Sequence, residues 1–75
     1  MTQFTYEIVQ PIAVLSDSGT NTAELNIISF NGSTPKYDLR RWGVRDGEKT
    51  MQKGIALSKE EVVALRNVLN DLTDI

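Results

Sequence analysis

The chain of 75 residues contains neither cysteine nor histidine. Without cysteine there are no disulfides and no thiolate nucleophile, and without histidine the commonest general base and the usual zinc ligands are missing as well. A domain of this length buries only about 60% of the surface that its unfolded chain exposes, so it is often stabilised by a metal, a disulfide or a second subunit. Of these three routes, the composition leaves oligomerisation open.

The sequence also shows no targeting segment and no long apolar run. Residues 1–6 are polar and aromatic where a secretory signal would carry positive charge followed by an apolar stretch. No segment approaches the ~20 apolar residues of a membrane helix. The lack of cysteine fits a reducing compartment. We therefore expect a cytoplasmic protein that has no membrane partner.

Catalytic chemistry would have to come from carboxylates, lysines and hydroxyls. The acidic residues lie apart in the sequence or at a helix start: Glu7, Asp17, Asp38, Glu60 and Glu61. No two of them have a spacing that predicts acid–base catalysis. Asp46 and Glu48 share one loop but supply only two metal ligands. We predict that the protein is not an enzyme and has no catalytic residue, metal, cofactor or small-molecule substrate.

Positive charge is concentrated in the middle of an otherwise acidic chain. The net charge is −2, yet residues 35–57 hold six of the eight basic residues and only three acidic ones. The single tryptophan, Trp42, lies in the same stretch. This segment is therefore the first candidate for a functional surface.

Four stretches rich in β-branched and aromatic residues alternate with turn-forming residues, which predicts four strands. They run over residues 4–15, 22–30, 36–42 and 49–57, with turns at 16–21, 31–35 and 43–48. Pro11 lacks an amide hydrogen, so the first strand is expected at a sheet edge or at a bulge. Gly54 is placed for a bulge that turns Lys53 out of register.

Period-two alternation assigns the side chains of the strands to two faces. The residues predicted to pack inward are Ala23, Leu25, Ile27, Ile55 and Leu57. The opposite face carries Ile28, Phe30, Lys36, Asp38, Arg40 and Trp42. We expect this second face to meet solvent, and Arg41 to be released to water where the strand bends.

A helix is predicted after the fourth strand. Ser58 at the N-cap and Glu61 at N3 have the spacing of a capping box. An apolar stripe then recurs at helical spacing, formed by Val62, Leu65, Val68, Leu69 and Leu72. One helix covers one face of a four-stranded sheet, so the other face must meet water, another subunit or a ligand. The predicted fold class is α+β, with one domain over residues 1–75.

The predicted solvent-facing side combines positive charge with aromatic rings. Single-stranded nucleic acid is held by cations that follow its phosphates and by rings on which its bases stack. Arg40, Trp42 and Phe30, with Lys53 from the next strand, would supply both parts. Two other interpretations fit the same pattern. One is a solvated sheet face on which Trp42 packs against a loop. The other is a protein-interaction module whose hot spot is an exposed Ile28, Phe30 and Trp42.

A family resemblance rests on two motifs and their spacing. They are Tyr-Asp-Leu-Arg-Arg-Trp at residues 37–42 and Lys-Gly-Ile-Ala-Leu-Ser at residues 53–58, separated by a polar loop and followed by an acidic amphipathic helix. Together they resemble the C-terminal domain of the positive cofactor 4 (PC4) family of transcriptional coactivators. The small bacterial YdbC-like members are also similar in length and opening sequence. The specific match covers about residues 28–73.

The resemblance implies a curved ββββα subunit that forms a homodimer and binds single-stranded DNA without strong sequence preference. The family's DNA-contacting arginine corresponds to Arg40, and its stacking rings correspond to Trp42 and Phe30. Its lysine before the glycine corresponds to Lys53. The chain departs from the family pattern by the inserted residues 33–35.

We therefore predict a homodimeric, sequence-tolerant binder of single-stranded DNA that acts in transcription, replication or repair, with RNA left open as an alternative ligand. The predicted nucleic-acid contacts are Phe30, Lys36, Arg40, Arg41, Trp42, Lys49 and Lys53. The predicted dimer interface is Val62, Leu65, Val68, Leu69 and Leu72. Salt dependence separates this function from protein interaction, because affinity falls with a slope of about −0.7 for each phosphate neutralised.

Overall fold

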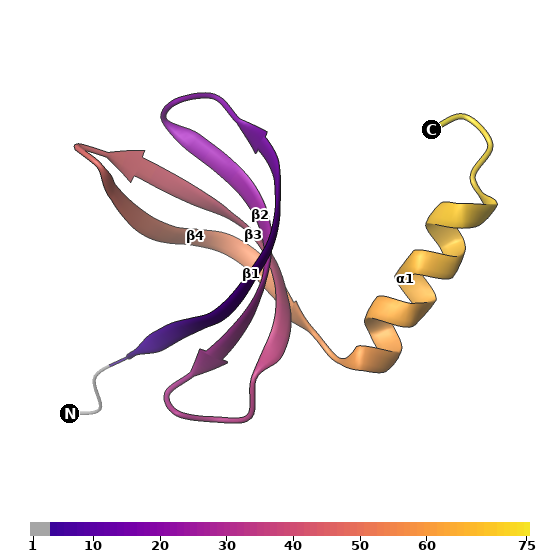
Figure 1. Cartoon of the computed structure of the whole chain (residues 1–75), viewed down its shortest axis with the longest axis horizontal. Coiled ribbons are helices and arrows are strands. Elements are labelled where there is room, and N and C mark those ends of the chain that lie inside the picture. Colours follow the sequence, from indigo (N-terminus) through magenta and orange to yellow (C-terminus); the bar gives the residue numbers. More distant parts are fainter. Residues whose placement is uncertain (1–3) are drawn as a thin grey trace.

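The computed structural model describes residues 4–75, which form a four-stranded sheet and one helix. The strands are β1 (Tyr6–Asp17), β2 (Asn21–Phe30), β3 (Lys36–Arg45) and β4 (Glu48–Leu57), and the helix is α1 (Lys59–Asp71). Each strand pairs antiparallel with the next, in the order β1-β2-β3-β4 (Figure 1). The predicted ββββα order is confirmed. The first three residues of the predicted domain lie outside the described range.

Tight turns lie in the connection between β2 and β3 and in that between β3 and β4, where the sequence predicts turns. Asn31 and Gly32 have φ values of 51° and 74°, and Asp46 and Gly47 have φ values of 54° and 80°. Two consecutive residues with positive φ characterise the type I′ turn, whose twist matches that of the flanking strands. The amide of Ser33 donates to the carbonyl of Phe30 over 2.9 Å and closes the first of these turns.

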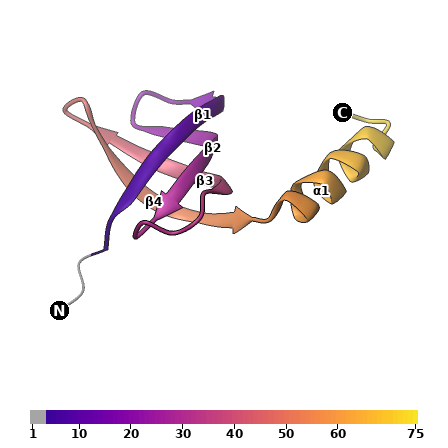
Figure 2. The same ribbon diagram turned by 60° about the horizontal axis from the view of Figure 1, so that its bottom comes forward.

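Irregular pairing coils the sheet strongly. β1 is an edge strand, as Pro11 predicts, and its register with β2 shifts at three places between Ile8 and Ser16. A further shift separates the Arg40–Gly54 pair from the Trp42–Met51 pair. Such bulges increase the local twist of a sheet. Figures 1 and 2 show the strands crossing at a large angle, with β1 passing over the others.

Coiling reverses the predicted inside and outside of the sheet. Thr22, Glu24, Asn26 and Ile28 are buried, whereas the alternating residues Ala23, Leu25 and Ile27 are only half-buried. The inward assignment of those three residues is therefore wrong. Local alternation separates the two faces correctly but does not say around which face the sheet closes. We call the side that holds Thr22 to Ile28 the inner face and the opposite side the outer face.

The helix begins as predicted but packs little against the sheet. Ser58 and Glu61 form both hydrogen bonds of the capping box, over 3.1 and 2.8 Å. Beyond this first turn α1 extends away from the end of β4 (Figures 1 and 2), and none of its residues is buried. Leu57 is buried as expected, but Ile55 is 54% exposed, because the helix does not cover it. No helix within residues 4–75 is both long and apolar enough to cross a bilayer.

A single chain of this shape has a very small core. Within residues 4–75 the buried hydrophobic side chains are Ile28, Trp42 and Leu57. The sheet nevertheless presents an apolar outer face, and the helix presents an apolar stripe. Burial of apolar surface is the dominant stabilising term in folding. Much of the apolar surface whose burial would stabilise the fold therefore remains exposed in a single chain.

Candidate nucleic-acid interface

The inner face brings β2 and β3 together in register. Glu24 lies opposite Arg40, Asn26 opposite Asp38, and Ile28 opposite Lys36. Residues directly opposite each other in an antiparallel pair point to the same side of the sheet. Positive and negative side chains therefore alternate along one surface.

Four of the five aromatic side chains of the protein form one cluster on this face. The ring of Phe4 lies 6.4 Å from that of Tyr6 and 6.0 Å from that of Phe30, measured between centroids. The ring of Tyr6 in turn lies 5.6 Å from that of Trp42. β1 and β3 are not neighbouring strands, so this last contact exists only because the sheet coils. We call these four residues the aromatic cluster.

Trp42 is fully buried in this cluster, with an exposed fraction of 0%. The prediction that it faces solvent is therefore wrong. Ile28 is also buried at 0%, so the protein-interaction hot spot of exposed Ile28, Phe30 and Trp42 does not exist on this chain. The physical reason is that the start of β1 folds over the inner face, which local alternation in β2 and β3 does not reveal.

Arg40 is held by two partners and keeps part of its hydrogen-bonding capacity. Its Nε and Nη2 donate to the two carboxylate oxygens of buried Asp38, over 2.5 and 2.6 Å, and its Nη1 donates to the carbonyl of Gln52 over 3.1 Å. These bonds use three of the five N–H groups of the guanidinium. Its central carbon also lies 5.4 Å from the ring centroid of Phe30. A fixed guanidinium with two remaining donors suits the binding of a phosphate oxygen.

Gly54 allows this arrangement of Arg40. A Cβ atom at position 54 would lie 1.8 Å from the Cβ of Arg40 and 2.8 Å from the carbonyl oxygen of Leu39. Real Cβ atoms do not approach so closely, so β4 can pass over Arg40 only with glycine at this position. The Lys-Gly-Ile motif thus contains a residue that positions the arginine of the other motif.

Glu24 and Lys49 form a second ion pair on the inner face. Lys49 Nζ lies 2.7 Å from Glu24 Oε1, and the Glu24 carboxylate also accepts from Thr22 over 2.7 Å and from Asn26 over 3.4 Å. Lys49 Nζ lies 5.4 Å from the ring centroid of Trp42. Burial raises the pKa of Glu24, but the hydrogen bonds from Lys49, Thr22 and Asn26 and the charge of Lys49 bring it below its usual value of 4.5.

This lowered pKa predicts a specific loss of stability in acid. A carboxylate whose folded pKa is depressed contributes stability above its unfolded pKa, and that contribution is lost as the pH falls through the folded pKa. The free energy of unfolding, measured with urea at pH 7 and at pH 3, should therefore fall less between these two pH values for Glu24→Gln than for the wild type. Glu7→Gln, on the edge strand, is the control for the change in net charge. Equal pH dependence in the wild type and Glu24→Gln would contradict a stabilising role for this ion pair.

The structure brings some of the predicted basic residues together and separates others. Arg40 and Lys49 lie on the inner face beside the aromatic cluster, and exposed Lys36 lies on the same face opposite Ile28. Arg41 is exposed, as predicted, but pairs with Ala23 on the outer face. Lys53 lies in the β4 bulge two residues before Ile55, so strand alternation assigns it to the outer face as well.

Three residues of the site were not predicted from the sequence. Phe4 and Tyr6 join the aromatic cluster, and Glu24 holds Lys49. The alternation of Phe4 and Tyr6 on one side of the first strand is a local signal for the cluster. Nothing local indicates the pair of Glu24 and Lys49, which lie 25 residues apart. No group of three or more potential metal ligands occurs within residues 4–75.

The protein thus combines a curved sheet, one helix and an inner face that carries charged and aromatic side chains. Comparison with known proteins agrees with this description. Residues 18–68 match the family described as Transcriptional Coactivator p15 (PC4). A protein of Treponema pallidum (strain Nichols), described as uncharacterized, is 41% identical over 71 residues, which cover 93% of this chain and 81% of that protein. The chain belongs to the PC4 family, as its two motifs predict.

Proposed function

We propose that this protein binds single-stranded DNA as a homodimer and with little dependence on base sequence. The observation that carries the proposal is the inner face, where basic side chains and the aromatic cluster share one surface. This combination is typical of proteins that hold single strands. Membership of the PC4 family supports it.

Phosphates would be bound by the cations of the inner face. Arg40 offers two unused N–H groups, and Lys36 is exposed and makes no ion pair with another described residue. The side chain of Lys49 is 42% exposed although it pairs with Glu24. Arg41 lies on the outer face of the central strand β3, and alternation assigns Lys53 of the edge strand β4 to the same face, so both would lie away from a strand bound on the inner face. Phosphate contacts carry no sequence information, which accounts for the proposed sequence tolerance.

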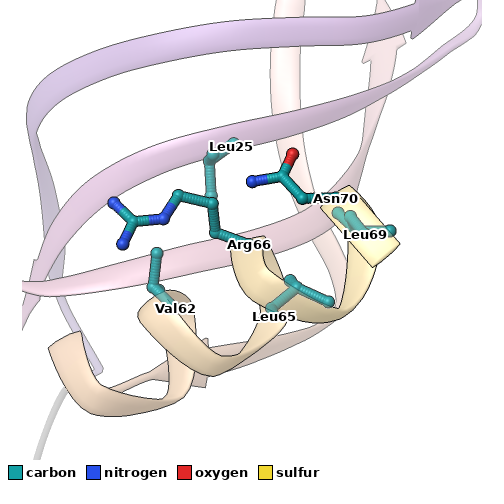
Figure 3. A pocket seen from close by; sticks show the side chains of 6 residues that line it. All are labelled: Leu25, Val62, Leu65, Arg66, Leu69 and Asn70. Atoms are coloured by element: carbon teal, nitrogen blue, oxygen red, sulfur yellow. The ribbon is translucent and has the colours of Figure 1, made fainter. Parts of the chain in front are cut away.

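Apolar surface outside the inner face supports the dimer. A cleft of about 250 Å³ lies between Leu25 of the outer face and the helix. Its helical wall is formed by Val62, Leu65, Arg66, Leu69 and Asn70 (Figure 3). We propose that the helix of a second subunit covers this region and buries the predicted stripe of Val62, Leu65, Val68, Leu69 and Leu72. Two chains would then share the core that one chain lacks.

The proposed activity is binding and not catalysis. It would serve transcription, replication or repair in the cytoplasm, wherever DNA is held open as a single strand. Single-stranded RNA remains the alternative ligand, because cations and stacking rings also bind RNA.

Lys36 offers a direct test of phosphate binding. Its substitution removes a cation from the inner face without disturbing an ion pair of the fold. Lys36→Ala should weaken binding of a labelled oligo-dT and flatten the plot of log affinity against log salt by about 0.7, the value for one phosphate contact on a single strand. Fluorescence anisotropy at several salt concentrations measures both effects. Lys59→Ala, at the start of α1, removes the same charge away from the inner face and should leave the slope unchanged. An equal slope in the wild type and Lys36→Ala would contradict binding of the backbone at this end of the face.

A further inference from the structure

Of the two rings predicted to stack on bases, Trp42 is covered completely and Phe30 is covered in part in the free protein. Trp42 is fully buried and contacts the ring of Tyr6 and the ammonium group of Lys49. Phe30 is half-buried and contacts the ring of Phe4 and the guanidinium of Arg40. A base stacks on a ring face that is free to receive it. Trp42 offers no such face without rearrangement, and the ring of Phe30 is partly occupied by its two contacts.

The accessible rings of the aromatic cluster belong to the start of the chain. Phe4 is 58% exposed and Tyr6 is 39% exposed, although each contacts one of the two covered rings. Large aromatic side chains that remain exposed beside basic residues are typical of binding surfaces rather than of cores.

Hydrogen bonds hold this segment in place. The amide of Thr5 donates to Asn31 Oδ1 over 2.8 Å, and the amide of Asn31 donates to the carbonyl of Thr5, also over 2.8 Å. Asn31 has positive φ in the turn between β2 and β3, a conformation that asparagine tolerates better than most residues. The backbone between the two rings is thus tied to the β2–β3 turn before any ligand binds.

We propose that Phe4 and Tyr6 are the base-stacking residues of this protein, and that Trp42 supports Tyr6 from below. Asn31 acts as a positioning residue, because it ties the backbone between the two rings to the β2–β3 turn. This inference rests on the proposed function and replaces the stacking roles that the sequence assigned to Trp42 and Phe30. Stacking on Phe4 and Tyr6 requires the bound single strand to pass over the start of β1.

A purely covering role of Phe4 and Tyr6 predicts the opposite effect on binding. If Phe4 and Tyr6 merely covered Trp42, a bound strand would displace them, and removing their rings would strengthen binding. Stacking on Phe4 and Tyr6 requires the reverse. The sign of the change in affinity therefore decides between the two roles.

The experiment compares two oligonucleotides of equal length, oligo-dT and an abasic strand that keeps the phosphates but has no bases. We expect Phe4→Leu and Tyr6→Leu each to weaken binding of oligo-dT by about 5- to 150-fold, the loss of one stacked base. Binding of the abasic strand should be unchanged. Tyr6→Phe, which keeps the ring, should bind both strands as the wild type does. Leu15→Ala is the control for removing an exposed apolar side chain from β1.

Asn31→Gly tests the positioning role, because glycine accepts the positive φ but cannot accept the hydrogen bond from Thr5. It should weaken binding of oligo-dT and leave the abasic strand unaffected, with the two rings still present. Circular dichroism confirms that each variant is folded.

The outcomes separate this inference from the function on which it rests. If the wild type binds oligo-dT and the two leucine variants bind it equally well or more tightly, the stacking role is wrong and the proposed function stands. The same conclusion follows if the leucine variants lose affinity for both strands alike. If the wild type binds neither strand at low salt, both proposals fail.

Discussion

Trp42→Ala is expected to destabilise the protein by about 3–5 kcal/mol, because truncating a buried aromatic side chain leaves a cavity and loses apolar burial. Within residues 4–75 Trp42 is one of three buried hydrophobic side chains and the largest of them. Small domains have total stabilities near the low end of about 5–15 kcal/mol. The midpoint of thermal unfolding should therefore fall by more than about 12 °C. Circular dichroism at matched protein concentration measures this change.

Trp42→Phe is the matched variant for this substitution. It keeps an aromatic ring beneath Tyr6, and it removes the indole Nε1, which is buried and has no hydrogen-bond partner among the described residues. A buried donor without a partner gives no stability. We expect the midpoint of thermal unfolding of Trp42→Phe to lie clearly closer to that of the wild type than the midpoint of Trp42→Ala does. If the alanine variant melts within a few degrees of the wild type, Trp42 does not support the core.

Leu69→Asp is expected to separate the proposed dimer into monomers. Leu69 lies in the middle of the apolar stripe, is 45% exposed on one chain and lines the cleft between the helix and the outer face. Burial of an unpaired carboxylate in such an interface costs several kcal/mol. The dissociation constant of the dimer should therefore rise by at least about a hundredfold. Sedimentation velocity over a range of protein concentrations measures the change.

The control for this variant adds the same charge elsewhere on the helix. Asn67 is exposed and lies on the side of α1 away from the stripe, so Asn67→Asp should leave the dimer intact. A wild type that sediments as a monomer at high concentration would contradict the proposed dimer. Equal dissociation of the two variants would mean that the stripe is not the interface.

The order of strands and helix could be predicted because its signals are local. Asp46 and Gly47 are the residues that a type I′ turn requires, and Ser58 and Glu61 form the capping box that begins the helix. Pro11 correctly indicated an edge strand. Each signal depends on residues that are close in the sequence.

The assignment of inside and outside could not be predicted in the same way. Leu25 is more apolar than Glu24, so alternation alone places Leu25 inside. The structure buries Glu24 because Lys49, Thr22 and Asn26 satisfy its carboxylate, and because the coiled sheet closes over it. Lys49 comes from a distant strand, so the sequence gives no local sign of this pairing.

The site was predicted in its chemistry more fully than in its geometry. The combination of Arg40 with aromatic rings on one face is present. The covering of Trp42 by Tyr6 is a contact between residues 36 positions apart that depends on the bulges of β1. Pro11 signals one of these bulges, but the other two register shifts have no clear local signal, and without the bulges β1 would not reach the inner face.

The central claim is that the inner face binds single-stranded DNA. The most direct test is a fluorescence anisotropy titration of the wild-type protein with labelled oligo-dT and with a duplex of the same length, at low and at moderate salt. We predict saturable binding of the single strand, much weaker binding of the duplex, and an affinity that falls as the salt concentration rises. Equal affinity for the two forms, or no binding of the single strand at low salt, would contradict the claim.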